Sequence, residues 1–146
     1  ITAMIHKLYT FLILCLVSFL AACGGQEELS NPLVDTLTAN DWELSSLLEK
    51  DVTEKDFGRQ LPFVHFEAGG QVSGSTGCNT FRGAFQSKGN DLRIDPGAMT
   101  KMACAGDGEK NFLNALNDVS SAKAGVNELE LLDSSGSVLM RLIPKK

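Results

Sequence analysis

Histidine, aromatic residues and long apolar runs are scarce in this sequence of 146 residues. It contains two histidines and 7% aromatic residues, and its 13 Lys and Arg residues are outnumbered by 18 Asp and Glu residues. An acidic chain with scattered charges lacks the basic surface that binds a nucleic-acid backbone, so we expect no nucleic-acid partner. The longest uncharged apolar run, at 8–22, has 15 residues. It is shorter than the roughly 20 residues that a membrane-spanning helix needs.

The apolar run at 8–22 follows Lys7 and predicts the hydrophobic core of a secretory signal peptide. Its last residues and the next one, Leu-Ala-Ala-Cys at 20–23, resemble the lipobox of bacterial lipoproteins. In a lipobox, a signal peptidase cleaves before the cysteine, whose thiol carries a diacylglyceryl group. The resemblance implies translation from Met4, removal of residues 1–22 and lipidation of Cys23. The alternative is an uncleaved anchor helix, which the short run and the cysteine at its end disfavour.

The segment after the lipobox is small and polar, without apolar periodicity. We therefore interpret residues 23–40 as the lipidated cysteine and a flexible tether, followed by a folded domain at 41–146. The residue after Cys23 is Gly24 rather than Asp, so the enterobacterial signal for inner-membrane retention is absent. We expect a lipid-anchored protein of the cell envelope, located at the outer membrane and facing the periplasm.

The four cysteines divide by context. Cys15 lies in the signal peptide and Cys23 is the lipidation site, which leaves Cys78 and Cys104 in an exported domain. Oxidising conditions favour a disulfide between them, and the loop of about 26 residues that it closes corresponds to roughly 3–4 kcal/mol of stabilisation. The alternative is a metal site with His65 as third ligand. The spacing lacks CxxC, and structural zinc normally takes four protein ligands, so we expect no metal.

Short stretches of alternating apolar and polar residues predominate after residue 40, and each predicts a strand with one buried face. Turns rich in glycine and asparagine between them favour antiparallel neighbours. Residues 107–122 instead predict one amphipathic helix, begun by Asp107, with Phe112 and Val119 on its apolar side and Glu109 on its polar side. The expected fold class is α+β: a small antiparallel β-barrel-like meander of about seven strands with one helix. The clearest alternating stretches are 42–45, 64–67, 91–95, 128–131 and 138–142.

A group of glycine, cysteine, asparagine and methionine residues lies in the middle of the domain. Gly77 permits a backbone angle closed to other residues, Asn79 can hydrogen-bond locally in a turn, and Gly83 lets another segment approach closely. With Trp42 and Leu44 upstream, this group resembles the signature of the META/HslJ family of bacterial envelope proteins over residues 41–143. The signature residues here are Gly77, Cys78, Asn79, Phe81, Gly83, Met99, Thr100, Met102 and Cys104.

The resemblance implies a compact antiparallel β-barrel-like fold with one helix, in an exported protein that is often a lipoprotein. Members of the family are associated with heat-shock expression, stress response and novobiocin resistance. No catalytic residues of the family can be carried over to this chain. The resemblance therefore favours a binding role rather than a chemical one.

Catalysis would depend on His65, the one histidine outside the signal peptide. A catalytic dyad or triad needs a nucleophile beside it, and neither Ser73 nor Ser75 has the context of a nucleophile elbow. Asp91 and Asp95 alternate with apolar residues and are typical of a solvated strand face rather than of an acid–base pair. We therefore expect that the protein is not an enzyme and that it binds no cofactor.

We expect a non-enzymatic, monomeric envelope lipoprotein, attached to the membrane by its lipid, that binds an envelope protein or an apolar ligand in envelope stress or novobiocin-type resistance. Phe81, Phe85 and Met102 surround the signature and are the candidate ligand-lining residues. The alternatives are a pilot or chaperone-like lipoprotein for secretion or outer-membrane assembly, by analogy of fold alone, and, less favoured, a hydrolase.

The lipobox interpretation predicts that Cys23→Ser abolishes incorporation of labelled fatty acid into the protein and blocks removal of residues 1–22. Gel mobility and metabolic labelling in a bacterial host measure both effects. Cys15→Ser is the matched control, because it removes a thiol from the apolar run without touching the acceptor, and it should keep full labelling. Labelling of the Cys23→Ser protein would contradict the prediction.

Overall fold

The computed structural model describes residues 31–146. The predicted signal peptide and Cys23 lie outside the described residues. Within residues 31–146 no helix is long and apolar enough to cross a membrane. The elements are α2 (Pro32–Thr38), β1 (Asp41–Leu47), β2 (Lys50–Asp51), the 3-10 turn η1 (Glu54–Asp56), β3 (Phe63–Phe66), β4 (Gln71–Ser75), β5 (Thr80–Lys88), β6 (Asp91–Met99), α3 (Gly108–Asp118), β7 (Ser121–Ala124), β8 (Leu129–Leu132) and β9 (Val138–Pro144).

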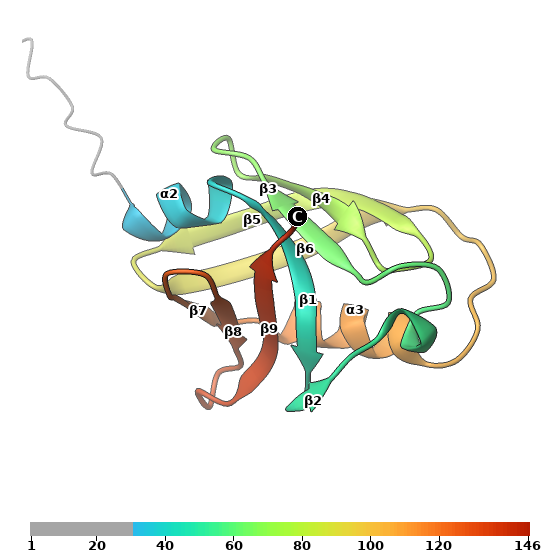
Figure 1. The fold of residues 1–146 in the computed structure, drawn as a ribbon. Coiled ribbons are helices and arrows are strands. Elements are labelled where there is room, and N and C mark those ends of the chain that lie inside the picture. Colours follow the sequence, from blue (N-terminus) through green and yellow to red (C-terminus); the bar gives the residue numbers. More distant parts are fainter. Residues whose placement is uncertain (1–30) are drawn as a thin grey trace, which may run out of the picture.

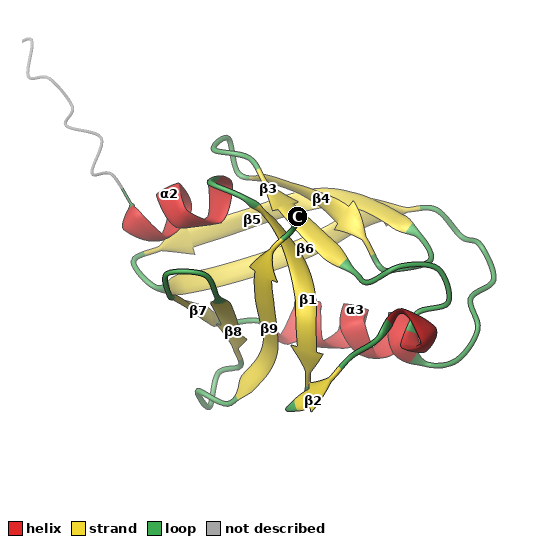
Figure 2. Ribbon diagram, in the orientation of Figure 1, coloured by secondary structure: helices red, strands yellow, loops and turns green. Residues whose placement is uncertain are grey.

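The strands form one antiparallel sheet that closes on itself (Figures 1 and 2). Its nine strands follow the order β2-β1-β3-β4-β5-β6-β7-β8-β9, and β1 also pairs with β9. β1 is paired on both sides, because Trp42 lies opposite Val64 of β3 on one side and Pro144 of β9 on the other. The predicted antiparallel α+β class is confirmed, with nine strands rather than about seven. β2 has only two residues, and β7 has a single buried residue, Ala122, so neither produces a clear alternating pattern.

Apolar and polar residues alternate along the strands, so the apolar side chains point into the interior of the closed sheet. Trp42, Val64 and Phe66 are almost fully buried, and Phe66 packs edge-on against Phe85 with ring centroids 5.1 Å apart. β6 and β7 pair only at Asp91 and Ser121. Beyond that pair, α3 packs against β6 and also contacts β9. The helix thereby covers the side where the sheet pairing is weakest.

Helix α3 ends earlier than the sequence predicts. It spans Gly108–Asp118 rather than 107–122, and residues Ser121–Ala124 form β7 instead. Asp107 occupies the N-cap position, but its side chain makes no capping hydrogen bond. Val119 is buried as predicted, although it lies just past the helix with an extended ψ of 128°. Pairing of β7 with β8 decides the conformation here, and local apolar spacing carries no information about that partner.

Residues 32–38 form a helix, so the predicted flexible tether is wrong for this segment. Asn31 caps α2 by accepting a hydrogen bond from the Leu33 amide at 3.1 Å, and Pro32 occupies the first turn. Leu33 and Leu37 are buried, and the Leu37 carbonyl accepts a bond from the Trp42 indole at 2.9 Å. Two leucines one turn apart are too few to stand out as periodicity, which is why the sequence pattern missed them.

Helix α2 contacts β3 and β7, two strands that are not neighbours in the ring. A segment that touches both must lie across the opening between them (Figure 1). The packed domain therefore begins near Asn31 rather than at residue 41.

The docking of α2 predicts that Leu37→Ala lowers the free energy of unfolding by about 2–5 kcal/mol, the usual cost of truncating a fully buried leucine. Asp35→Ala, on the exposed side of the same helix, should change it by less than about 0.5 kcal/mol. Urea denaturation of the purified proteins measures both. Equal effects of the two substitutions would show that α2 is not part of the folded unit.

Candidate functional site

The two halves of the signature meet at one corner of the molecule. Gly77, Cys78 and Asn79 form the turn between β4 and β5, and residues 99–104 leave the end of β6. The structure joins Cys78 to Cys104 by a disulfide with Cα atoms 6.0 Å apart. The turn and the segment 99–104 are therefore covalently linked across 26 positions of sequence.

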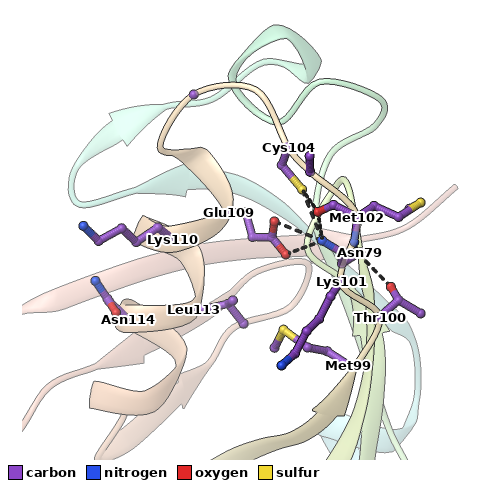
Figure 3. A pocket seen from close by; sticks show the side chains of 12 residues that line it. Asn79, Met99, Thr100, Lys101, Met102, Cys104, Glu109, Lys110, Leu113 and Asn114 are labelled. Carbon is purple, nitrogen blue, oxygen red and sulfur yellow. Dashed lines mark hydrogen bonds between the residues drawn. The ribbon is translucent and has the colours of Figure 1, made fainter.

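The Asn79 side chain joins the same two segments by hydrogen bonds (Figure 3). It is 3% exposed. Its Oδ1 accepts from the Thr100 hydroxyl and from the Met102 amide, both at 2.8 Å, while its Nδ2 donates to the Met102 carbonyl at 3.1 Å. One buried side-chain amide is thus bonded to three polar groups of a segment that lies beyond the end of strand β6.

Glu109 fastens helix α3 to this corner. Its carboxylate accepts from Asn79 Nδ2 at 3.0 and 3.2 Å, one distance for each oxygen, and from the Thr76 hydroxyl at 3.0 Å. The sequence placed Glu109 on the polar side of the helix and did not identify these partners. An acidic residue in the first turn of a helix is an ordinary complement to the helix dipole, so nothing in the sequence pointed to its partners.

Two signature glycines are required by the backbone around them. Gly77 has φ +90°, and a Cβ there would overlap the side chain of Phe57. A Cβ on Gly83 would collide with the carbonyl oxygen of Asp95 on the neighbouring strand β6. The first glycine supplies a left-handed turn and the second a close strand approach.

The three candidate ligand-lining residues do not share one cavity. Phe81 and Phe85 are 3% and 6% exposed and belong to the hydrophobic core, whereas Met102 is 46% exposed. Phe81 also borders a shallow surface depression beside Thr100. Met102 lies at the edge of a separate groove. The sequence placed these residues near the signature without showing which side of the sheet each one faces.

A groove of about 600 Å³ lies between the segment 99–106 and α3, and we call it the signature groove. Figure 3 shows Glu109 and Leu113 pointing from α3 toward the opposite wall, with Lys110 and Asn114 directed away from it. Met99 and Leu113 are partly buried apolar residues that pack on the core and form its apolar surface. Its lining residues are Asn79, Met99, Thr100, Lys101, Met102, Ala103, Cys104, Gly106, Glu109, Lys110, Leu113 and Asn114.

A second groove of about 530 Å³ lies on the other side of Gly106, between the β1–β2 turn, η1 and the start of α3. Leu48 in that turn is 51% exposed and has φ 50°, an unusual conformation for a bulky side chain. Three acidic residues, Asp51, Asp56 and Asp107, line this groove. The pKa of Asp56 is lowered chiefly by the Thr53 backbone amide and also by the Thr53 hydroxyl. Asp56 thus remains ionised as part of a local turn.

Strand register brings a serine, the histidine and an aspartate into one row on the outer face. His65 lies opposite Asp41 of β1 and Ser73 of β4, and its Nδ1 is 2.6 Å from the Asp41 carboxylate. The sequence did not reveal this juxtaposition, because register between strands is set by the fold. Among the described residues no hydrogen bond joins Ser73 to His65, and the side chains of His65 and Asp41 are 42% and 46% exposed. The row lacks the activated nucleophile and the desolvated setting of a catalytic triad.

The hydrogen bonds of Asn79 predict that Asn79→Ala lowers the free energy of unfolding by about 1–3 kcal/mol, because it removes the bonds to the partly buried Met102 backbone and one of the two donors to Glu109. Asn114→Ala, at an exposed position of α3, should change it by less than about 0.5 kcal/mol. Urea denaturation under non-reducing conditions provides the measurement. A loss for Asn79→Ala no larger than that of the control would show that the network does not hold the corner together.

None of the curated proteins matches the chain. A crystal structure of a DUF4847 family protein from Bacteroides vulgatus ATCC 8482 has a TM-score of 0.59 at 16% identity, covering 78% of this chain and 98% of that one. An NMR structure of a protein from Burkholderia xenovorans has a TM-score of 0.59 at 22% identity, covering 80% and 89% of the two chains. At these identities the similarity shows a shared fold and nothing more.

The family is shown by sequence. The family model described as "META domain" matches residues 35–146, which include α2 from its fourth residue, the whole sheet and the signature corner. The resemblance inferred from the signature residues is therefore confirmed, and the chain belongs to the META domain family.

Proposed function

We propose that this protein is a non-enzymatic envelope lipoprotein that binds an apolar ligand, or an apolar segment of an envelope protein, in the signature groove. The observation that carries the proposal is an apolar surface held between rigid walls. Met99 and Leu113 remain partly accessible, although both pack against the hydrophobic core. A ligand that covers them would gain hydrophobic stabilisation without first ordering the site.

The walls of the groove are fixed by three connections, two of which share the Asn79 side chain. The Cys78–Cys104 disulfide and the Asn79 side chain hold the segment 99–104 to the β4–β5 turn. Glu109 holds the start of α3 to the same Asn79 amide at 3.0 Å. A binding surface that is preorganised in this way loses little conformational entropy when it binds.

A binding role is better supported than a catalytic one. The row of Asp41, His65 and Ser73 is solvated and lies on the outer face of the sheet. The lining of the signature groove combines apolar and polar side chains, and its cysteine, Cys104, is held in the disulfide. The carboxylate of Glu109 is occupied by hydrogen bonds from Asn79 and Thr76. These groups suit recognition and positioning.

The lipobox at Cys23 supports attachment to the envelope by a lipid, with the outer membrane and the periplasmic side as the proposed location. Because α2 docks on the domain, only the residues before Asn31 connect it to the lipid. Their reach is about 30 Å even if fully extended. The bound partner would therefore lie close to the membrane, in keeping with a role in envelope stress or novobiocin-type resistance.

The proposal is tested by photo-crosslinking and affinity capture of the lipidated protein from its native envelope, followed by identification of bound proteins and lipids. We expect Leu113→Gln to reduce recovery of the captured species at least about tenfold, because it places a polar amide on the apolar surface of the groove. Met99→Gln should have the same effect from the opposite wall.

Val126→Gln is the matched control, since Val126 is 97% exposed and lies outside the groove. It should leave recovery unchanged, and a thermal melt of each variant verifies folding. Recovery of a single secretion or assembly protein would favour the pilot or chaperone-like alternative, and recovery of lipid would favour a carrier. Capture that is unaffected by both groove variants would overturn the assignment of the groove.

A further inference from the structure

The signature corner gathers three side chains of the kinds that bind metal ions. The Sγ atoms of Cys78 and Cys104 and a carboxylate oxygen of Glu109 all lie within 4.8 Å of one another. They come from three segments: the β4–β5 turn, the segment after β6 and the first turn of α3. It is the one group of three such side chains found among residues 31–146.

After reduction of the disulfide, small side-chain movements would give this group the dimensions of a thiolate site. Zinc binds thiolate sulfur at about 2.3 Å and carboxylate oxygen at about 2.0–2.2 Å, so ligand atoms of a tetrahedral site lie roughly 3.5–3.8 Å apart. The carboxylate must therefore approach by no more than about 1 Å, and the two sulfurs must separate once their bond is broken. With Cα atoms 6.0 Å apart, the cysteines can reach a common ion by side-chain rotation.

A hydrogen-bond donor of the kind that surrounds protein metal sites is already in place. Asn79 Nδ2 lies 3.2 Å from the Cys104 sulfur and 3.0 Å from a Glu109 oxygen. Donation from an amide stabilises thiolate and carboxylate charge and orients both ligands. Asn79 is itself held by the Thr100 hydroxyl and the Met102 amide, so its position does not depend on the disulfide alone.

We propose that the reduced form of this corner is a binding site for one thiophilic divalent cation, of which Zn²⁺ is the representative, with Cys78, Cys104 and Glu109 as protein ligands. A dithiol reductant gives two electrons and two protons to the Cys78–Cys104 bond and is itself oxidised to a disulfide. Binding of the cation then releases the two thiol protons to solvent and forms two metal–sulfur bonds and one metal–oxygen bond. Water occupies the fourth position.

The site differs from the metal site considered from the sequence, in which His65 was the third ligand. His65 lies on the outer face of β3, with its Nδ1 2.6 Å from the Asp41 carboxylate, and is not in the group. Glu109 takes the third position because α3 begins beside the β4–β5 turn. The consequence is that the cation joins the same segments as the disulfide and also α3, so the walls of the signature groove stay connected when the disulfide is reduced.

The test is a titration of the purified full chain with Zn²⁺ against a chromogenic chelator, after reduction by a phosphine and without oxygen. We expect the reduced wild-type protein to bind one Zn²⁺ and the oxidised protein to bind none at this site. Glu109→Gln should weaken binding by about tenfold or more, because it replaces a charged ligand by a neutral one. Substitution of Co²⁺ should give sulfur-to-metal charge-transfer absorption in the reduced protein alone.

Asp107→Asn is the matched control, since Asp107 lies two residues before Glu109 and outside the group of ligands, and it should bind Zn²⁺ like the wild type. The double variant Cys78→Ser, Cys104→Ser measures any binding by the other cysteines of the chain. Equal affinity of the reduced wild type and the reduced Glu109→Gln protein would overturn the proposal, as would binding to the double variant with undiminished stoichiometry. A reduced chain that binds Zn²⁺ only after unfolding gives the first of these results, because Glu109 would then contribute nothing.

Discussion

The buried amide of Asn79 is the interaction on which the signature corner depends. It satisfies the Thr100 hydroxyl and the Met102 backbone on one side and the Glu109 carboxylate on the other. Since the amide has one acceptor oxygen and two donor hydrogens, no other side chain of similar size offers the same set of partners. The disulfide adds a covalent link between the turn and the segment 99–104, but it does not reach α3. Hydrogen bonds from Asn79 and Thr76 to Glu109 join the first turn of the helix to the corner.

The closed sheet provides the rigid frame for this corner. β1 pairs with β3 and β9, so the chain has few exposed strand edges and a continuous interior face. α2 lies across one opening, and α3 covers the side where β6 and β7 separate. Each helix therefore completes the burial of a core that the strands leave open. The signature groove lies where α3 and the segment after β6 diverge, outside that core.

The proposed binding role and the proposed cation site use one structural arrangement in two ways. The groove needs walls at a fixed separation, and both the disulfide and a cation bound to Cys78, Cys104 and Glu109 would supply that constraint. Neither proposal requires a catalytic group. The outer row of Asp41, His65 and Ser73 shows why residue types alone are a poor guide to catalysis, because the same three types lie in register there on a solvated surface.

Residues with local signatures were predicted correctly from the sequence. The alternation around Trp42, Val64 and Leu129 identified which strand faces are buried, and the antiparallel α+β class followed from the short turns. The signature residues from Gly77 to Cys104 identified the family. These features depend on neighbours within a few positions, where a period of two or a required glycine is visible in the sequence.

The tertiary structure decided everything that depends on which distant segments meet. Glu109 reaches Asn79 across 30 positions, α2 docks through two leucines, and residues 121–124 become a strand because β8 accepts them as a partner. Closure of the sheet by β1 and β9 also sets which residues share a face across strands. Such contacts leave no periodic pattern in the sequence, because their free energy comes from packing and hydrogen bonding between segments and not from the conformational preference of either one.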